Sequence, residues 1–298
     1  MISASQAPRS IGQVLDAGFS LYRRAFLVAI PYTIIAALIG FASQFYFRMN
    51  QPQLVLGQMP HFSLGLVAVY FLVILASMSL QQGMLCKLDD VYSDNNRLSL
   101  IDGLLLGAKR LLPVVGAFLI CMICFCLVAI AAAIVVGIVG AVAGAAGGKI
   151  VAVIVGGLFG IAAVVGLFWS FVACGFFIFA AVLDGAGPLK SLGRSMALVQ
   201  GNFWRTATIQ TVALIIVIAA YAALAALAAL IVPFGGMAKV LTGQAIAFST
   251  AQLVVLLAMG VLNALCYPLM YSIGIANYRD LILRKSGDDL AARIADAA

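Results

Sequence analysis

The chain alternates between long apolar stretches and short polar connections. Six stretches reach or exceed the roughly 20 residues that a helix needs to cross a bilayer. These stretches are 25–47, 64–86, 111–146, 150–183, 206–232 and about 250–276. Because their apolar residues run almost without interruption, instead of recurring on one helical face, the pattern predicts membrane-spanning helices. The expected fold class is an all-α membrane protein with about six transmembrane helices.

The third stretch is too long for one straight crossing. At about 1.5 Å per residue, residues 111–146 would measure about 54 Å, against a hydrocarbon core of about 30 Å. Its last part is rich in glycine, between Gly137 and Gly148. We therefore expect this helix to project beyond the bilayer or to break within that segment. We also expect its glycine face to pack against the fourth stretch, near Gly156 and Gly160.

Composition agrees with lipid as the main solvent. Hydrophobic residues make up 65% of the 298 residues and charged residues only 9%, whereas soluble domains carry about 25% charged residues. The net charge of +7 in such a chain suggests anionic lipid headgroups as partners and not nucleic acid.

The basic residues are distributed unevenly between the two sides of the predicted membrane. Fourteen of the 17 lie in the N-terminal segment, in the connections 87–110 and 184–205, and in the C-terminal tail. The opposite connections hold only Arg48, Lys149 and Lys239. All ten acidic residues are Asp, and they lie on the same side as the fourteen. By the positive-inside rule, both termini are predicted to be cytoplasmic.

A threefold internal repeat is predicted from the order of these segments. Amphipathic stretches at 11–23, 98–110 and 188–201 precede the first, third and fifth spans. The second, fourth and sixth spans are each followed by an aspartate: Asp89, Asp184 and Asp280. We predict three pseudo-repeats, each an interfacial amphipathic helix plus a transmembrane hairpin. They cover about 9–90, 97–184 and 187–281 of a single polytopic domain (1–283), which a short cytoplasmic tail (284–298) follows.

Two stretches carry a resemblance to a known family. They are RSIGQVLDAGFSLYRRAF, from Arg9, and LDGAGPLKSLGRSMALVQGNFWR, from Leu183. They resemble uncharacterised bacterial inner-membrane proteins similar to the membrane domain that precedes the catalytic domain of some glycerophosphoryl diester phosphodiesterases. The resemblance implies a six-helix module in the bacterial inner membrane. It implies no hydrolase, because the chain ends about twenty residues after the last span.

Few residues offer catalytic or metal-binding chemistry. The chain has one histidine, His61, in a short connection, no glutamate, and none of the usual catalytic signatures. The cluster Cys121, Cys124 and Cys126 lies inside the third span, where thiols act as small apolar packing residues. We therefore expect no enzymatic activity, no metal and no cofactor.

The spans contain only sparse, uncharged polar residues, among them Gln44, Gln81 and Asn263. The absence of charge argues against a proton- or ion-coupled carrier, in which such groups mark the path. Tyr267 and Tyr271 flank Pro268 in the last span. This trio either lines a cavity or marks a proline kink with interfacial aromatics.

Basic residues at the cytoplasmic entry of each odd-numbered span are the candidate lipid-headgroup contacts. They are Arg23, Arg24, Lys109, Arg110, Arg194 and Arg205. Each could contribute about 1 kcal/mol next to an anionic leaflet. The simpler interpretation is that they only anchor the topology.

The leading hypothesis is a non-enzymatic inner-membrane protein that binds, moves or organises membrane lipids or other hydrophobic small molecules. The alternative is an accessory or scaffold subunit that packs against another membrane protein, or against a second copy, through its small-residue faces. A carrier for a polar solute is the weakest hypothesis, because the spans offer so few polar groups.

Overall fold

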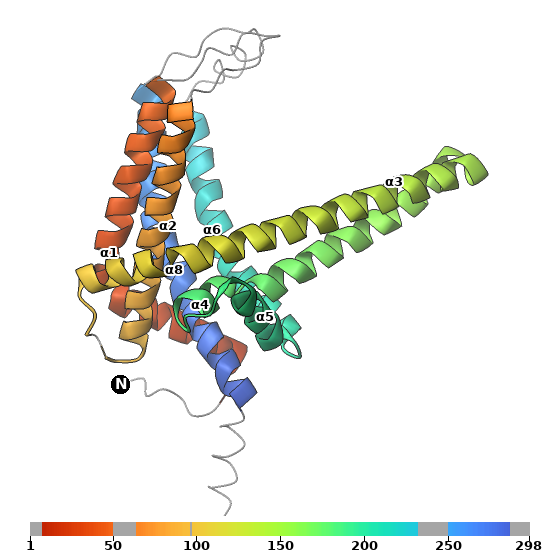
Figure 1. Cartoon of the computed structure of the whole chain (residues 1–298). Helices are drawn as coiled ribbons and strands as arrows, with labels where there is room; N and C mark the ends of the chain where they lie inside the picture. The colour runs from red at the N-terminus through yellow and green to blue at the C-terminus, as the bar shows by residue number, and fades with distance from the viewer. Residues whose placement is uncertain (1–7, 50–63, 96, 232–249, 287–298) are drawn as a thin grey trace, which may run out of the picture. The chain divides into compact units, whose positions relative to one another are not determined.

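The computed structural model describes residues 8–49, 64–95, 97–231 and 250–286, and within these ranges it is all-helical without any strand (Figure 1). The helices are α1 (Ile11–Met49), α2 (Leu64–Tyr92), α3 (Leu100–Cys174), α4 (Phe177–Val182), α5 (Pro188–Val199), α6 (Phe203–Ile231) and α8 (Thr250–Ser286). Five helices in the described residues are long and apolar enough to cross a membrane. The chain is therefore a multi-pass helical membrane protein, as the apolar pattern predicts.

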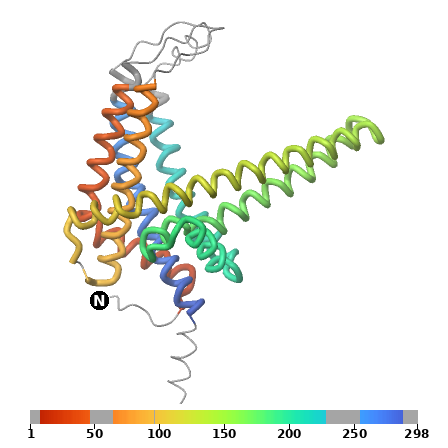
Figure 2. Tube along the Cα trace, viewed as in Figure 1, coloured from red at the N-terminus to blue at the C-terminus, as the bar shows by residue number. Residues whose placement is uncertain are grey.

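The longest helix, α3, is broken at Gly148. This glycine has φ 77° and ψ −179°, a conformation that residues with a side chain rarely adopt. The chain reverses there, so that residues 100–147 and 149–174 form the two arms of a helical hairpin (Figure 2). A break between Gly137 and Gly148 is thereby confirmed. With the arms counted separately, the five long helices become six.

We expected the glycine face of the first arm to pack near Gly156 and Gly160 of the second arm, and this position is wrong. A Cβ atom at Gly144 would lie 3.2 Å from the Cβ of Ala152, so the arms touch close to the turn. At Gly156 and Gly160, an added Cβ would meet no described atom within 4 Å. These two glycines therefore lie away from the contact between the arms and face open space.

The chain divides into two compact units. Unit 1 comprises residues 1–111 and 209–280, and unit 2 comprises residues 112–208 and 281–298. Unit 1 therefore contains α1, α2, the start of α3, most of α6 and almost all of α8. Unit 2 contains most of the α3 hairpin, α4, α5 and the start of α6.

Unit 1 is held together by close helix contacts at small residues. Its buried apolar cluster joins α1, α6 and α8 through Val14, Ala17, Ile209, Ala213, Ile273 and Ala276. A Cβ at Gly18 would lie 2.8 Å from the Cα of Ile273, and one at Gly83 would lie 2.8 Å from the carbonyl oxygen of Gly103. Only glycine permits such an approach between backbones.

Unit 2 is organised around the buried side chain of Ser195 on α5. Its hydroxyl accepts the N–H of Phe176 (3.0 Å) and donates to the carbonyl of Ala173 (2.7 Å). These two backbone groups flank the end of α3 and the start of α4, where helical hydrogen bonds are interrupted. Next to them, the Arg194 guanidinium pairs with Asp184 at 2.9 Å.

The three amphipathic stretches differ in how they join the spans. Residues 11–23 and 98–110 lead without interruption into α1 and α3, whereas α5 is a separate helix. The separation arises at Gly201, whose φ of 86° ends α5 before Phe203 starts α6. In each stretch small or apolar residues four apart are buried in the protein: Ala17 and Leu21, Gly103 and Gly107, Ser191 and Ser195. The repeat itself stays a prediction.

Candidate functional site

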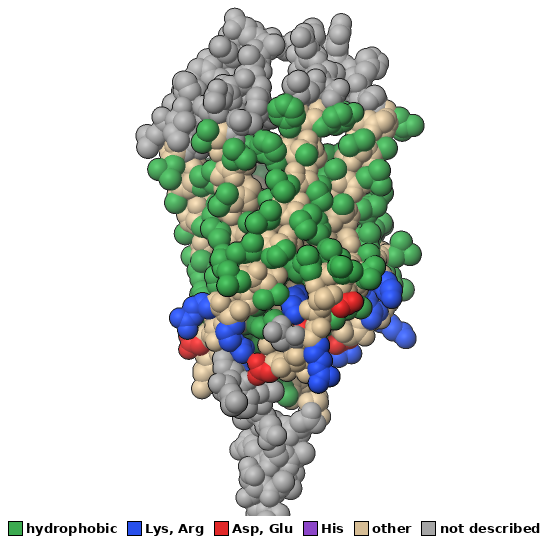
Figure 3. All heavy atoms as spheres, turned by 90° about the vertical axis from the view of Figure 1, so that its left-hand side faces the viewer, with side chains coloured by type: hydrophobic (Ala, Val, Ile, Leu, Met, Phe, Trp, Pro, Cys, Tyr) green, Lys and Arg blue, Asp and Glu red, His purple; other side chains and the backbone are tan. Residues whose placement is uncertain are grey.

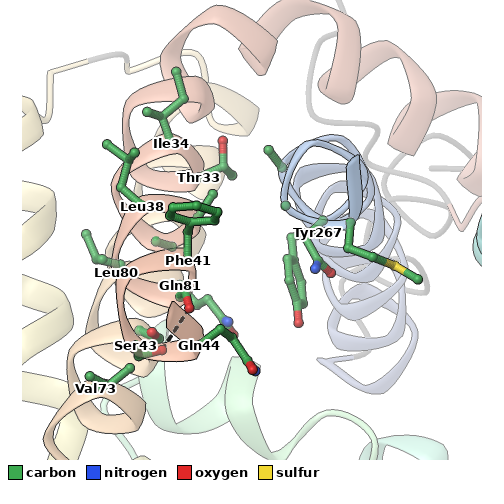
Figure 4. A pocket seen from close by; sticks show the side chains of 18 of the residues that line it. Thr33, Ile34, Leu38, Phe41, Ser43, Gln44, Val73, Leu80, Gln81 and Tyr267 are labelled. Atoms are coloured by element: carbon green, nitrogen blue, oxygen red, sulfur yellow. Dashed lines mark hydrogen bonds between the residues drawn. The ribbon is translucent and has the colours of Figure 1, made fainter. Parts of the chain in front are cut away.

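A cavity of about 830 Å³ lies in unit 1 among α1, α2 and α8 (Figure 4). Most of its lining is aliphatic or aromatic, as with Ile34, Leu38 and Phe41 of α1, Val73 and Leu80 of α2, and Leu256, Leu257 and Val261 of α8. Among the described residues, no Lys, Arg, Asp or Glu contributes to the lining. The cavity is therefore an apolar space bordered by uncharged polar groups.

Several hydroxyl groups of the lining are already engaged with backbone. Thr33 donates to the carbonyl of Ile30 (2.9 Å), and Ser43 donates to that of Gly40 (2.8 Å). Tyr32, almost fully buried, donates to the carbonyl of Leu100 (3.2 Å), at the start of α3. These bonds hold the hydroxyl groups against the helix backbones that form and border the walls of the cavity.

Two amide side chains of the lining each accept a hydrogen bond from a tyrosine of another helix. Tyr271 of α8 donates to Oε1 of Gln81 on α2 (3.2 Å), and Tyr221 of α6 donates to Oδ1 of Asn263 on α8. Figure 4 shows Tyr267 extending from α8 toward the side of the cavity that carries Gln81 and Gln44. Of the predicted proline trio, Tyr267 lines the cavity and Tyr271 fixes one of its amides.

Charged side chains gather at one end of the face that Figure 3 shows, below a broad apolar surface. In unit 1, Arg279 of α8 binds Asp89 of α2 through both Nε (3.0 Å) and Nη2 (2.6 Å). The backbone N–H of Arg9 donates to Asp280 (2.7 Å), and its guanidinium donates to the hydroxyl of Tyr92 (2.9 Å). Two aspartates that follow predicted spans are thus used to join helix ends.

The structure assigns different surroundings to the six predicted headgroup contacts. Arg24 pairs with Asp94 at 3.0 Å, and Arg194 pairs with Asp184 at 2.9 Å. Arg205 is half-buried and has an interaction partner in the protein. The other three, Arg23, Lys109 and Arg110, form no ion pair with any described residue. The sequence indicated the arginines but not their aspartate partners, Asp94 from the connection before α3 and Asp184 from the residues between α4 and α5.

The six predicted contacts are divided between the two units. Arg23, Arg24, Lys109 and Arg110 belong to unit 1, whereas Arg194 and Arg205 belong to unit 2. The cavity as a whole was not predicted from the sequence, although its amides were noted among the polar residues of the spans. Which amide meets which tyrosine depends on the register and rotation of three helices, and the sequence does not specify these.

The cysteine cluster of the third span is divided in space. Cys121 lies next to Cys174 of the other α3 arm, with which it shares a hydrogen bond, while Cys124 and Cys126 are exposed. No group of three His, Cys, Asp or Glu residues with metal-binding geometry occurs in the described part of the chain.

The chain belongs to a family described as Domain of unknown function (DUF7847), whose domain matches residues 10–281. No curated protein and no solved structure matches it. The family match carries no link to the membrane domain of glycerophosphoryl diester phosphodiesterases, so that resemblance stays a prediction based on the two stretches that carry it.

Proposed function

We propose that the protein is a non-enzymatic integral membrane protein of the bacterial inner membrane that binds, moves or organises membrane lipids or other hydrophobic small molecules. The observation that carries this proposal is the uncharged cavity in unit 1. Ligand cavities in proteins measure about 300–1,000 Å³ and are mostly apolar with a few placed polar groups. The unit 1 cavity, at about 830 Å³, has both properties.

The cavity lies between apolar segments of helices that are long enough to span a bilayer. An acyl or isoprenoid chain in that position would exchange lipid contacts for protein contacts without a desolvation cost. A charged solute would instead have to leave water for a site without counter-charges, which is strongly unfavourable. The lining therefore favours a hydrophobic ligand over a polar solute.

In this proposal the charged end of unit 1 faces the cytoplasm, together with both termini. Arg23, Lys109 and Arg110 remain as the headgroup contacts in unit 1, because Asp94 already binds Arg24. The three pseudo-repeats of interfacial helix and hairpin remain part of the proposal. The paired buried small residues of the three amphipathic stretches support them.

Native mass spectrometry of the protein, purified in a mild detergent, tests the binding function. We expect a hydrophobic molecule of defined mass to stay bound to the chain and to be released at higher collision energy. A protein that stays bare, even after incubation with an extract of bacterial lipids, would contradict the proposal.

A second candidate function is that of an accessory subunit. The α3 hairpin favours it, because the most apolar part of this helix is buried nowhere in the protein. Glycines with open space beside them, such as Gly140 and Gly156, would allow close approach of another helix. Stoichiometric co-purification with one membrane protein, and no retained lipid, would favour this function over the first.

A further inference from the structure

We propose that the unit 1 cavity selects a neutral amphiphile whose polar end carries carbonyl oxygens, held by the side-chain N–H groups of Gln81 and Asn263. The inference rests on the proposed function, and it adds the chemical class of the ligand. A long-chain ester of glycerol and an isoprenoid quinone both belong to this class. Anionic phospholipids do not, and they would bind at the basic end of unit 1 instead.

The first step of the argument is the direction of the hydrogen bonds. The side-chain oxygens of Gln81 and Asn263 accept hydrogen bonds from Tyr271 and Tyr221, respectively. The NH₂ group of each amide is therefore the part that is left to bind a ligand. Neither NH₂ group has an acceptor among the described residues. An amide has two N–H donors, and in an apolar environment each unmade hydrogen bond is costly. The two amides therefore provide donors for which a ligand can supply acceptors.

The second step concerns the other hydroxyl groups of the lining. Tyr32, Thr33 and Ser43 donate their hydroxyl hydrogens to backbone carbonyls. These three hydroxyl hydrogens are therefore already used and are not available to a ligand. Gln44, Ser77 and Tyr267 also offer donors in the lining. Gln81 on α2 and Asn263 on α8 are the two lining amides whose orientation is fixed by a hydrogen bond from a tyrosine.

The third step is the absence of charge. Among the described lining residues there is no Lys or Arg to neutralise a phosphate or carboxylate, and no Asp or Glu to pair with an amine. An ionised group placed there would lose its hydration without receiving a counter-ion. Carbonyl oxygens are strong acceptors without charge, and they match the donors that the two amides offer.

The test compares two ligands that differ only in their carbonyl groups. The purified full-length protein is titrated with dioleoylglycerol, a diester, and with the matching dioleyl diether, and binding is measured by native mass spectrometry. We expect the diester to bind about tenfold more tightly, as one or two additional hydrogen bonds would give. Oleate serves as the charged probe and should bind more weakly than the diester.

Two variants and one control assign the preference to the amides. Gln81→Met and Asn263→Leu remove the donors at nearly constant volume. Each should bring the ratio of the diether Kd to the diester Kd closer to one. Gln210→Met makes the same change in α6, outside the lining, and should leave the preference unchanged. The wild-type comparison needs no variant, so a variant that fails to fold does not prevent the test.

The outcomes separate the two proposals. Equal binding of diester and diether by the wild-type protein would overturn the inference and leave the proposed function in place. A preference that survives in both amide variants would also overturn it. Absence of binding for every hydrophobic ligand would overturn the proposed function together with the inference.

Discussion

The helices around α1 and α2 in unit 1 and the α3 hairpin in unit 2 share one composition but differ in their contacts. Both regions are apolar and rich in glycine. In unit 1, a Cβ at Gly107 would lie 2.6 Å from the backbone nitrogen of Gly83, while in the hairpin a Cβ at Gly140 would meet no described atom. The comparison teaches that small residues in apolar runs permit close approach without specifying it. In unit 1 the close contacts are accompanied by hydrogen bonds and ion pairs between helices, such as those of Tyr271 with Gln81 and of Arg279 with Asp89.

The largest effect should come from a substitution at the glycine contact of unit 1. Gly107→Leu places a side chain against the backbone of Ser79 and Gly83, which cannot retreat without separating α2 from α3. We expect a loss near the upper end of the ~1–3 kcal/mol typical of overpacking. Thermal unfolding in detergent measures it. Gly140→Leu is the matched control, and an equal loss there would remove the distinction between the two regions.

The second prediction tests the ion pairs at the charged end. Asp89→Asn weakens the double contact with Arg279, a pair whose side chains are only 16% and 33% exposed. We expect a loss of about 1.5–3 kcal/mol, as for hydrogen bonds to charged groups. Asp94→Asn breaks the pair with Arg24, whose side chains are 55% and 36% exposed. It should cost less than about 1 kcal/mol. If the two variants unfold alike, the Asp89 pair does not hold α2 against α8.

The sequence predicted the membrane class, the long spans and, as one of two alternatives, a break between Gly137 and Gly148, because these follow from hydropathy and from the special backbone of glycine. It also placed Asp89 and Asp280 directly after predicted spans. It did not predict their partners Arg279 and Arg9, since partners depend on which helices are neighbours. For the same reason Gln81 and Asn263 were recognisable as buried polar residues, but not as parts of one cavity.

The smallest effect concerns the basic residues without an acidic partner. Replacing Arg23, Lys109 or Arg110 singly by Gln should weaken binding of phosphatidylglycerol or cardiolipin by about 1 kcal/mol in each variant, and the effect should fade as salt is added. Binding to lipid vesicles over a salt series measures it. Lys149→Gln, next to the hairpin turn, is the control. An equal loss of lipid binding in Lys149→Gln would reveal only a general dependence on net charge.

The central claim is that unit 1 encloses a hydrophobic ligand and that the hairpin encloses none. It is tested most directly by filling each region with one bulky side chain and measuring the retained ligand by native mass spectrometry. Ala264 lines the cavity on α8, and Ala145 lies exposed in the hairpin. The account predicts that Ala264→Trp loses the bound molecule while Ala145→Trp keeps it at the wild-type occupancy. Full occupancy in Ala264→Trp, or the same loss in both variants, would contradict it.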